Sequence, residues 1–312
     1  MSIRTDLALE AKEMYSENAK DTSKIDGVEV KITKNEGITT TKIKITNQNG
    51  VDALSKPMGT YVTIEAPDIK YSVLVYEKTC LLLADEIRSL ANINTKTKTL
   101  VVGLGNKKIT PDALGPDVIS KLMVTSHLKE HLSEFSTDDI TSVCAIAPGV
   151  LGTTGMETAQ IIKGVINQVK PDLIIAVDAL ASRSLDRIST TIQLTDTGIN
   201  PGAGVENSRE RLDEKTLGVK VIAIGVPTVV DAKTIASDTI DMILGDLKKN
   251  IVEDDKKDKL IKKTLSKNIS SLMVTPKDID SVIEKTSKAV ANGINMALHK
   301  NLTFEDIESF VG

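Results

Sequence analysis

Aromatic residues, histidine and cysteine are all scarce in this chain of 312 residues, which contains three Phe, four Tyr, no Trp, three His and two Cys. So few aromatic rings leave the surface poorly equipped to stack on single-stranded bases. The two thiols, Cys80 and Cys144, cannot form a disulfide framework and are typical of a reducing compartment. A net charge of −4 without a basic cluster argues against nucleic acid or an anionic membrane as a partner.

Long apolar segments are also missing. No run of 18 apolar residues occurs that could span a bilayer, and the first 20 residues contain no apolar segment of the kind found in signal peptides. The hydrophobic fraction of 40% is nevertheless ordinary for a globular protein. We therefore expect a cytoplasmic enzyme with an aliphatic core.

The pattern of apolar and polar residues changes along the chain. GVEVKITKNEG, TTTKIKIT and GTYVTIEAPD alternate β-branched and polar residues, which predicts an N-terminal antiparallel β region. From EKTCLLLADE, which is typical of a helix start at Cys80, short apolar strands alternate with amphipathic helices. This second pattern predicts an α/β fold with a mostly parallel sheet flanked by helices. Thr275 and Pro276 would begin a C-terminal helix.

Two motifs point to cofactors, and both are incomplete. Gly103 and Gly105 follow a strand, but lysine replaces the third glycine of a dinucleotide-binding loop, so a tight strand-to-loop turn is the simpler interpretation. His127 and His131 match the inverted zincin motif H-x-x-E-H. Their polar flanks favour a solvated helix end, and the remaining histidine, His299, is distant in sequence. We expect no cofactor and no metal.

Three aspartates are candidates for acid–base chemistry. Asp196 lies in Asp-Thr-Gly, the tripeptide of pepsin-like proteases, but those enzymes need two copies and an all-β fold, so we interpret it as a turn residue. Asp112 and Asp178 each follow a buried strand, and parallel strands place such residues on one rim of the sheet. Helix capping, or pairing with Arg183 or Arg187, would be the structural alternative.

Several long stretches together resemble the germination protease family of endospore-forming bacteria: VVGLGNKKITPDALGPDV, APGVLGTTGMET, KPDLIIAVDALASRSLDRISTTIQLTDTGINPGAGV, VIAIGVPTVVDA and LMVTPKDID. The resemblance implies an atypical aspartic protease whose fold is similar to that of hydrogenase maturation proteases. The family's two catalytic aspartates match Asp112 and Asp178. Two departures from the family pattern are Glu206, where glycine is expected, and a short region at residues 245–270.

The resemblance also implies a biological role. Members of this family are homotetrameric endopeptidases that begin the degradation of small acid-soluble spore proteins during germination in the spore core, and they are made as zymogens. No nucleic acid, membrane or cofactor partner is implied. Two other functions stay open: a metal-dependent peptidase related to hydrogenase maturation proteases, and a non-catalytic spore nucleoid-associated protein.

The N-terminal segment resembles a substrate of the family. Substrates are cut after the acidic residue of Thr-Glu-[Phe/Ile]-Ala-Ser-Glu, and residues 5–10, TDLALE, match this pattern by type at five of six positions. We therefore predict self-cleavage between Asp6 and Leu7. Acid should favour it, because protonated carboxylates such as Asp6 would hold the segment less well.

The expected domains follow from these observations. They are a propeptide (residues 1–6), a helix with a β-rich region (7–79), an α/β catalytic core (80–250), and a charged connector with C-terminal helices (251–312).

Overall fold

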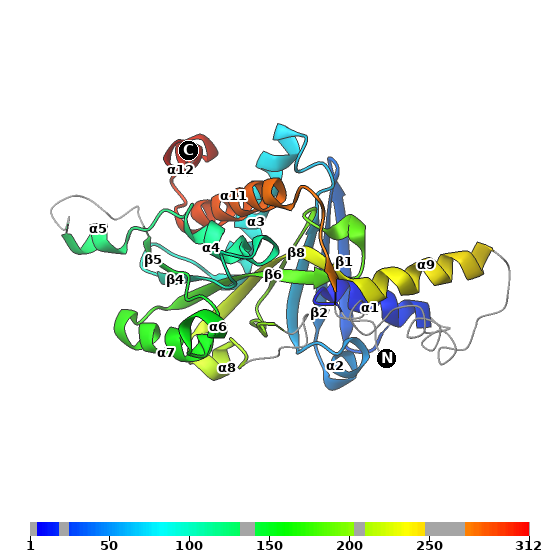
Figure 1. Cartoon of the computed structure of the whole chain (residues 1–312). Coiled ribbons are helices and arrows are strands. Elements are labelled where there is room, and N and C mark those ends of the chain that lie inside the picture. Colours follow the sequence, from blue (N-terminus) through cyan, green and yellow to red (C-terminus); the bar gives the residue numbers. More distant parts are fainter. Residues whose placement is uncertain (1–4, 19–24, 132–140, 203–209, 247–271, 312) are drawn as a thin grey trace.

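The computed structural model describes residues 5–18, 25–131, 141–202, 210–246 and 272–311 (Figure 1). The described strands form one nine-stranded sheet in the order β1-β2-β3-β7-β8-β6-β4-β5, with β9 paired to β8. The strands are β1 (Val28–Asn35), β2 (Ile38–Ile45), β3 (Gly59–Glu65), β4 (Lys98–Gly103), β5 (Ser142–Ile146), β6 (Leu173–Ser182), β7 (Thr191–Thr195), β8 (Lys220–Asp231) and β9 (Met273–Val274).

The predicted α/β class and the N-terminal antiparallel strands are confirmed. The parallel part of the sheet is β5-β4-β6-β8, and β1, β2 and β3 continue it through β7 as an antiparallel part. β7, which reads as one more strand of the parallel series, runs antiparallel to both of its neighbours. One sheet therefore passes through both regions that the sequence pattern separates.

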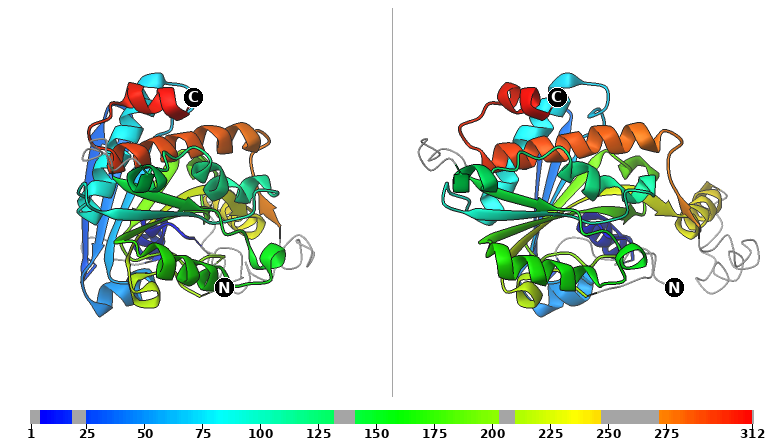
Figure 2. Two further views of the ribbon diagram at one scale, coloured as in Figure 1. Left: turned by 90° about the vertical axis from the view of Figure 1, so that its left-hand side faces the viewer. Right: turned by 60° about the vertical axis from the view of Figure 1, so that its left-hand side comes forward.

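Helices cover both faces of the sheet (Figures 1 and 2). α3, α4 and α11 pack on one face, where the larger aliphatic core lies. α7 and α8 cover the other face of the parallel part, and α1 lies with α2 against the antiparallel part. The helices are α1 (Ala8–Asn18), α2 (Gln48–Leu54), α3 (Val73–Ala91), α4 (Leu114–Ile119), α5 (Ser126–His131), α6 (Leu151–Thr154), α7 (Thr158–Val169), α8 (Glu214–Leu217), α9 (Ala232–Asp246), α11 (Ile279–Leu298) and α12 (Phe304–Val311), with short 3-10 turns η1 (Thr110–Asp112) and η2 (Leu185–Arg187).

Two predicted helix starts are wrong by several residues. α3 begins at Val73, before the stretch EKTCLLLADE, because the Ser72 side chain caps it by accepting a hydrogen bond from Val75 N at 3.3 Å. α11 begins at Ile279, after a turn at Lys277 and Asp278 in which Ile279 N donates to Pro276 O at 3.2 Å. Residue 80 therefore lies inside α3. The change of sequence pattern there does not mark a boundary between separately packed parts of the chain.

Some sequence predictions fall outside the described residues. Glu206 and nearly all of the short region 245–270 belong to them, as do residues 1–4 of the predicted propeptide. Within the described residues, none of the helices combines the length and the apolar character that crossing a bilayer requires.

The carboxyl end of β6 positions the candidate site. β4 ends at Gly103, which pairs with Val177, so β6 extends five residues beyond it, from Asp178 to Ser182. Two main-chain N–H groups of this extension donate to carboxylates: Ala179 N to its neighbour Asp178 at 2.9 Å, and Ala181 N to Asp6 at 2.8 Å. The part of β6 without β4 beside it is thus lined by acidic side chains.

Candidate active site

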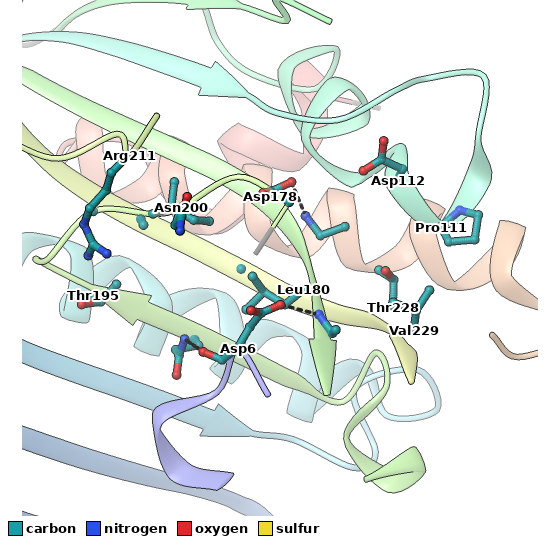
Figure 3. A pocket seen from close by; sticks show the side chains of 18 of the residues that line it. Asp6, Pro111, Asp112, Asp178, Leu180, Thr195, Asn200, Arg211, Thr228 and Val229 are labelled. Carbon is teal, nitrogen blue, oxygen red and sulfur yellow. Dashed lines mark hydrogen bonds between the residues drawn. The ribbon is translucent and has the colours of Figure 1, made fainter. Parts of the chain in front are cut away.

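A pocket of about 450 Å³ opens at this end of the sheet (Figure 3). Its polar lining comes from the N-terminal segment, the α2–β3 loop, η1, β6, β7 and the loop after β7. The side chains that matter below are Asp6, Lys56, Asp112, Asp178, Gln193 and Arg211. The pocket therefore combines both aspartates that the sequence predicts with residues that the sequence does not single out.

Asp112 is held in place by a close approach of two loops. Gly105 has φ +112°, and a Cβ atom there would lie 2.0 Å from the Asp112 carbonyl oxygen. The Asn106 N–H donates to a carboxylate oxygen of Asp112 at 2.8 Å. Only glycine permits this geometry, which confirms the interpretation of Gly103 and Gly105 as a strand-to-loop turn. Burial raises the pKa of Asp112, although the hydrogen bond from Asn106 opposes this.

Asp178 faces the same pocket from β6 and is 8% exposed. Burial raises its pKa well above the usual value, and the negative charge of Asp112 raises it further. Asp6 adds a smaller effect in the same direction, while the N–H of Ala179 lowers the pKa. The charge effect runs from Asp112 to Asp178, because a negative charge near a buried carboxyl group favours its protonated form.

Asp196 has a structural role. Its carboxylate accepts a hydrogen bond from Thr60 N at 2.8 Å, and its own N–H donates to Thr60 O at 3.3 Å. These contacts fasten the end of β7 to β3, and Gly198 follows with φ +75°. Asp196 lies in a bend directly after β7, and its contacts join two strands rather than cap a turn.

The histidines do not come together in the described part of the chain. His127 is exposed on α5, whereas His299 is buried beside Met123 at the end of α11. His131 is the last residue of α5, and the structure does not describe its side chain. Among the residues described, no three acidic, histidine or cysteine side chains are placed to hold one metal ion.

The segment before α1 lies along the exposed edge of β6. Asp6 N donates to Ala181 O at 3.1 Å, and its carboxylate accepts from Ala181 N. Leu7 and Ala8 are both 0% exposed. The bond between Asp6 and Leu7 is therefore buried beside the pocket.

The expected effect of acid on Asp6 has the wrong sign. Burial raises the pKa of Asp6 above that of a free aspartate, although Ala181 N and Lys56 lower it. A carboxyl group with a raised pKa binds its proton more tightly in the folded state, so acid strengthens the hold on this segment through Asp6.

Arg183 and Arg187 form ion pairs with glutamates of α1 and not with the aspartate pair. Arg187 Nη1 lies 3.2 Å from Glu10, and both of its terminal nitrogens donate to Glu13 at 2.7 Å. Arg183 contacts Glu17 at 2.8 Å. The sequence alternative, in which these arginines neutralise Asp112 or Asp178, is therefore wrong for the described contacts.

Lys56 and Gln193 are the functional candidates that sequence reasoning missed. Gln193 lies in the middle of β7 and is 6% exposed, between strands that pair with it on both sides. A buried amide in the apolar-rich strand TIQLT is a signal that could have been noticed. Lys56 follows α2 in an unremarkable loop, and nothing in the local sequence distinguishes it from other lysines.

Comparisons with known proteins identify the family of the chain. The family model described as "Germination protease" matches residues 8–259 and 250–311. The chain belongs to the germination protease family. A germination protease of Clostridium tetani is 49% identical over 324 residues, with 100% of both chains covered.

More distant relatives give the same result. The germination protease of Caldanaerobacter subterraneus is 47% identical, with 100% of this chain and 98% of that one covered, and the Bacillus cereus germination protease is 40% identical, with 96% and 95% covered. Membership in the germination protease family makes the chain a peptidase, and so a hydrolase. A [NiFe] hydrogenase maturation protease from Thermococcus kodakarensis is similar in structure at a TM-score of 0.36 and 19% identity, covering 70% of this chain and 99% of that one.

Proposed function

We propose that this peptidase uses Asp112 and Asp178 as an acid–base pair to activate water for cleavage of peptide bonds. The observation that carries the proposal is that both carboxyl groups face one pocket and that the charge of Asp112 raises the pKa of Asp178. No cation forms an ion pair with either one in the described part of the chain. Such a pair is suited to hold one proton and one negative charge at neutral pH.

The roles follow from burial. Asp178 is the more deeply buried of the two and keeps the shared proton, while Asp112 is ionised and acts as the base. Asp112 takes a proton from water as the water oxygen attacks the carbonyl carbon, and Asp178 donates its proton to the carbonyl oxygen. When the C–N bond breaks, the proton on Asp112 passes to the leaving nitrogen and the gem-diol proton returns to Asp178.

The proposed substrates are the small acid-soluble proteins of the spore, cut after an acidic residue during germination in the spore core. The proposed first substrate is the chain itself, between Asp6 and Leu7, so that the active form begins at Leu7. The support for a zymogen is the burial of this bond beside the aspartate pocket. We propose that domain 1–6 is the propeptide.

The proposed assembly is a homotetramer. Nearly all of β1 is exposed at the edge of the sheet, with Val30 40% and Ile32 56% exposed. Apolar residues on an open edge strand need covering. Sedimentation at micromolar protein should give a tetramer, and a stable monomer would contradict the proposal.

The test is cleavage of a peptide with the pattern Thr-Glu-Phe-Ala-Ser-Glu, read by mass spectrometry. We expect one cut, after the glutamate, in the presence of a chelator as well as without it. Activity that is lost in chelator and restored by a divalent ion would replace the aspartate-pair mechanism with a metal-dependent one. No cut in either condition would refute the proposed specificity.

A further inference from the structure

The carbonyl oxygen of Asp6 accepts hydrogen bonds from two side chains. Lys56 Nζ donates to it at 3.0 Å, and Gln193 Nε2 donates to it at 3.2 Å. This oxygen belongs to the peptide bond that joins Asp6 to Leu7. Lys56 follows α2 and Gln193 lies on β7, so two separate elements converge on one carbonyl group.

Gln193 also holds the other side of the same bond. Its Oε1 accepts a hydrogen bond from Ala8 N at 2.7 Å. The Gln193 side chain thus spans the bond between Asp6 and Leu7. Its Nε2 donates to the carbonyl of Asp6, and its Oε1 accepts from the N–H of Ala8. Lys56 makes a further contact, to Thr5 O at 3.2 Å.

These contacts lie in the same pocket as the aspartate pair. Lys56, Gln193, Asp112 and Asp178 all line the one pocket, and Asp6 enters it from the N-terminal segment (Figure 3). In the part of the chain that the structure describes, every hydrogen bond of the Lys56 ammonium goes to the carbonyl of residue 5 or 6. Removal of residues 1–6 would take both of these partners away and leave a partly buried cation facing the pocket.

We propose that Lys56 and Gln193 are catalytic residues that bind the carbonyl oxygen of the bond being cut, first in the chain's own N-terminal segment and then in protein substrates. The inference rests on the proposed function and identifies the part of that site that the aspartate pair does not supply. Donors aimed at a carbonyl oxygen stabilise the negative charge that grows on it during attack.

The chemical step is then complete. As the water oxygen bonds to the carbonyl carbon, the C=O electron pair moves toward the oxygen, where Lys56 and Gln193 donate hydrogen bonds alongside the proton of Asp178. The pair returns when the C–N bond breaks, and the nitrogen takes the proton that Asp112 received from water. Lys56 keeps its own protons throughout.

The first experiment compares self-processing of the full-length wild-type chain with that of Lys56→Met, Lys56→Arg and Gln193→Leu. Loss of one such donor should slow appearance of the Leu7 terminus by about 10²–10³-fold, with partial rescue by arginine. An anchoring role predicts the reverse, because a loosened segment would be cut as fast or faster. Lys163→Met on α7, whose ammonium contacts Glu210, is the matched control and should process normally.

The second experiment measures catalysis after the N-terminal segment has been removed. Each variant is processed with a small amount of tagged wild-type enzyme, which is then withdrawn, and kcat and KM are measured with the peptide substrate. We expect Lys56→Met and Gln193→Leu to lower kcat by about 10²–10³-fold with much less change in KM. Thermal melts identify a variant that has failed to fold, in which case the other variant decides.

The outcomes separate this inference from the proposed function. If wild-type enzyme cuts and both variants cut at its rate, Lys56 and Gln193 are not catalytic, while the aspartate proposal stands. If wild-type enzyme in trans processes an inactive Asp112→Asn chain but not the Lys56 and Gln193 variants, their slow self-processing comes from a changed cleavage segment, and the catalytic assignment is refuted. If wild-type enzyme cuts neither itself nor the peptide, both proposals fall together.

Discussion

Two groups of carboxylates lie beside the last residues of β6, and their electrostatic surroundings differ. In the pocket, Asp6, Asp112 and Asp178 accept hydrogen bonds from main-chain N–H groups, and the pKa of each is raised, chiefly by burial. On the other side of the N-terminal segment, Glu10 and the other glutamates of α1 face two arginines.

The second group is paired with cations and main-chain donors. Glu10 is 1% exposed, yet it accepts hydrogen bonds from Arg183 N at 2.7 Å and Ser184 N at 3.1 Å and lies beside the guanidinium of Arg187. Each negative charge has a donor or a cation, so burial costs little. The comparison shows that the buried glutamate of α1 has an arginine and main-chain donors beside it, whereas Asp112 and Asp178 form no ion pair among the described residues.

The largest expected effect is on catalysis. Asp112→Asn and Asp178→Asn each remove one half of the proton exchange and should lower kcat for peptide cleavage by about 10²–10⁴-fold. Asp196→Asn, which keeps an oxygen that can accept from Thr60 N, is the matched control. Near-normal activity in both pocket variants, with loss in the control, would place the chemistry elsewhere.

The second effect concerns the paired group. Arg187→Met leaves the buried Glu10 without its guanidinium, and breaking a buried pair from one side costs about 3–5 kcal/mol in the free energy of unfolding. Urea denaturation measures it. A loss below about 1 kcal/mol would mean that Glu10 is satisfied by main-chain N–H groups alone.

The third prediction is a gain in the free energy of unfolding, and its size depends on pH. Because the pKa of Asp178 is raised in the folded chain, that chain holds a proton which the unfolded chain releases, and the free energy of unfolding falls as pH rises between the two pKa values. Asp178→Asn removes this dependence. The variant should therefore gain stability relative to wild type as pH rises above the unfolded pKa of about 4, measured by thermal or urea unfolding.

Asp306 supplies a control of reversed sign for that measurement. The hydroxyl and N–H of Thr303 hold the pKa of Asp306 below its usual value, so its contribution to stability is present above the unfolded pKa and is lost as pH falls. Asp306→Asn should thus lose stability relative to wild type as pH rises. If the two variants changed in parallel, a general effect of pH would explain both.

The smallest effect is expected at an exposed ion pair. Lys163 and Glu210 lie 2.6 Å apart, but their side chains are 42% and 43% exposed. Lys163→Gln should change the free energy of unfolding by less than about 1 kcal/mol, because solvent and salt screen such pairs. A larger loss in urea denaturation would show that this pair does more than a surface contact.

The sequence by itself was enough to predict the fold class and to identify Asp112 and Asp178 as site candidates. Apolar strands separated by amphipathic helices allow few alternatives to a covered sheet, and Asp112 and Asp178 stand out because each ends an apolar strand or its loop. The turn at Gly105 could likewise be predicted from the sequence, since only a residue without Cβ can lie against Asp112. These features depend on neighbours that are close in sequence.

Tertiary structure alone decided which groups meet. Lys56, Gln193 and Asp6 are distant in the sequence, and they come together because β7 inserts antiparallel between β3 and β8 while the N-terminal segment lies along β6 past the end of β4. The sign of the acid effect on Asp6 was also decided there. A pKa is set by burial and by charges around the group, and these belong to the folded chain and not to residues 5–10.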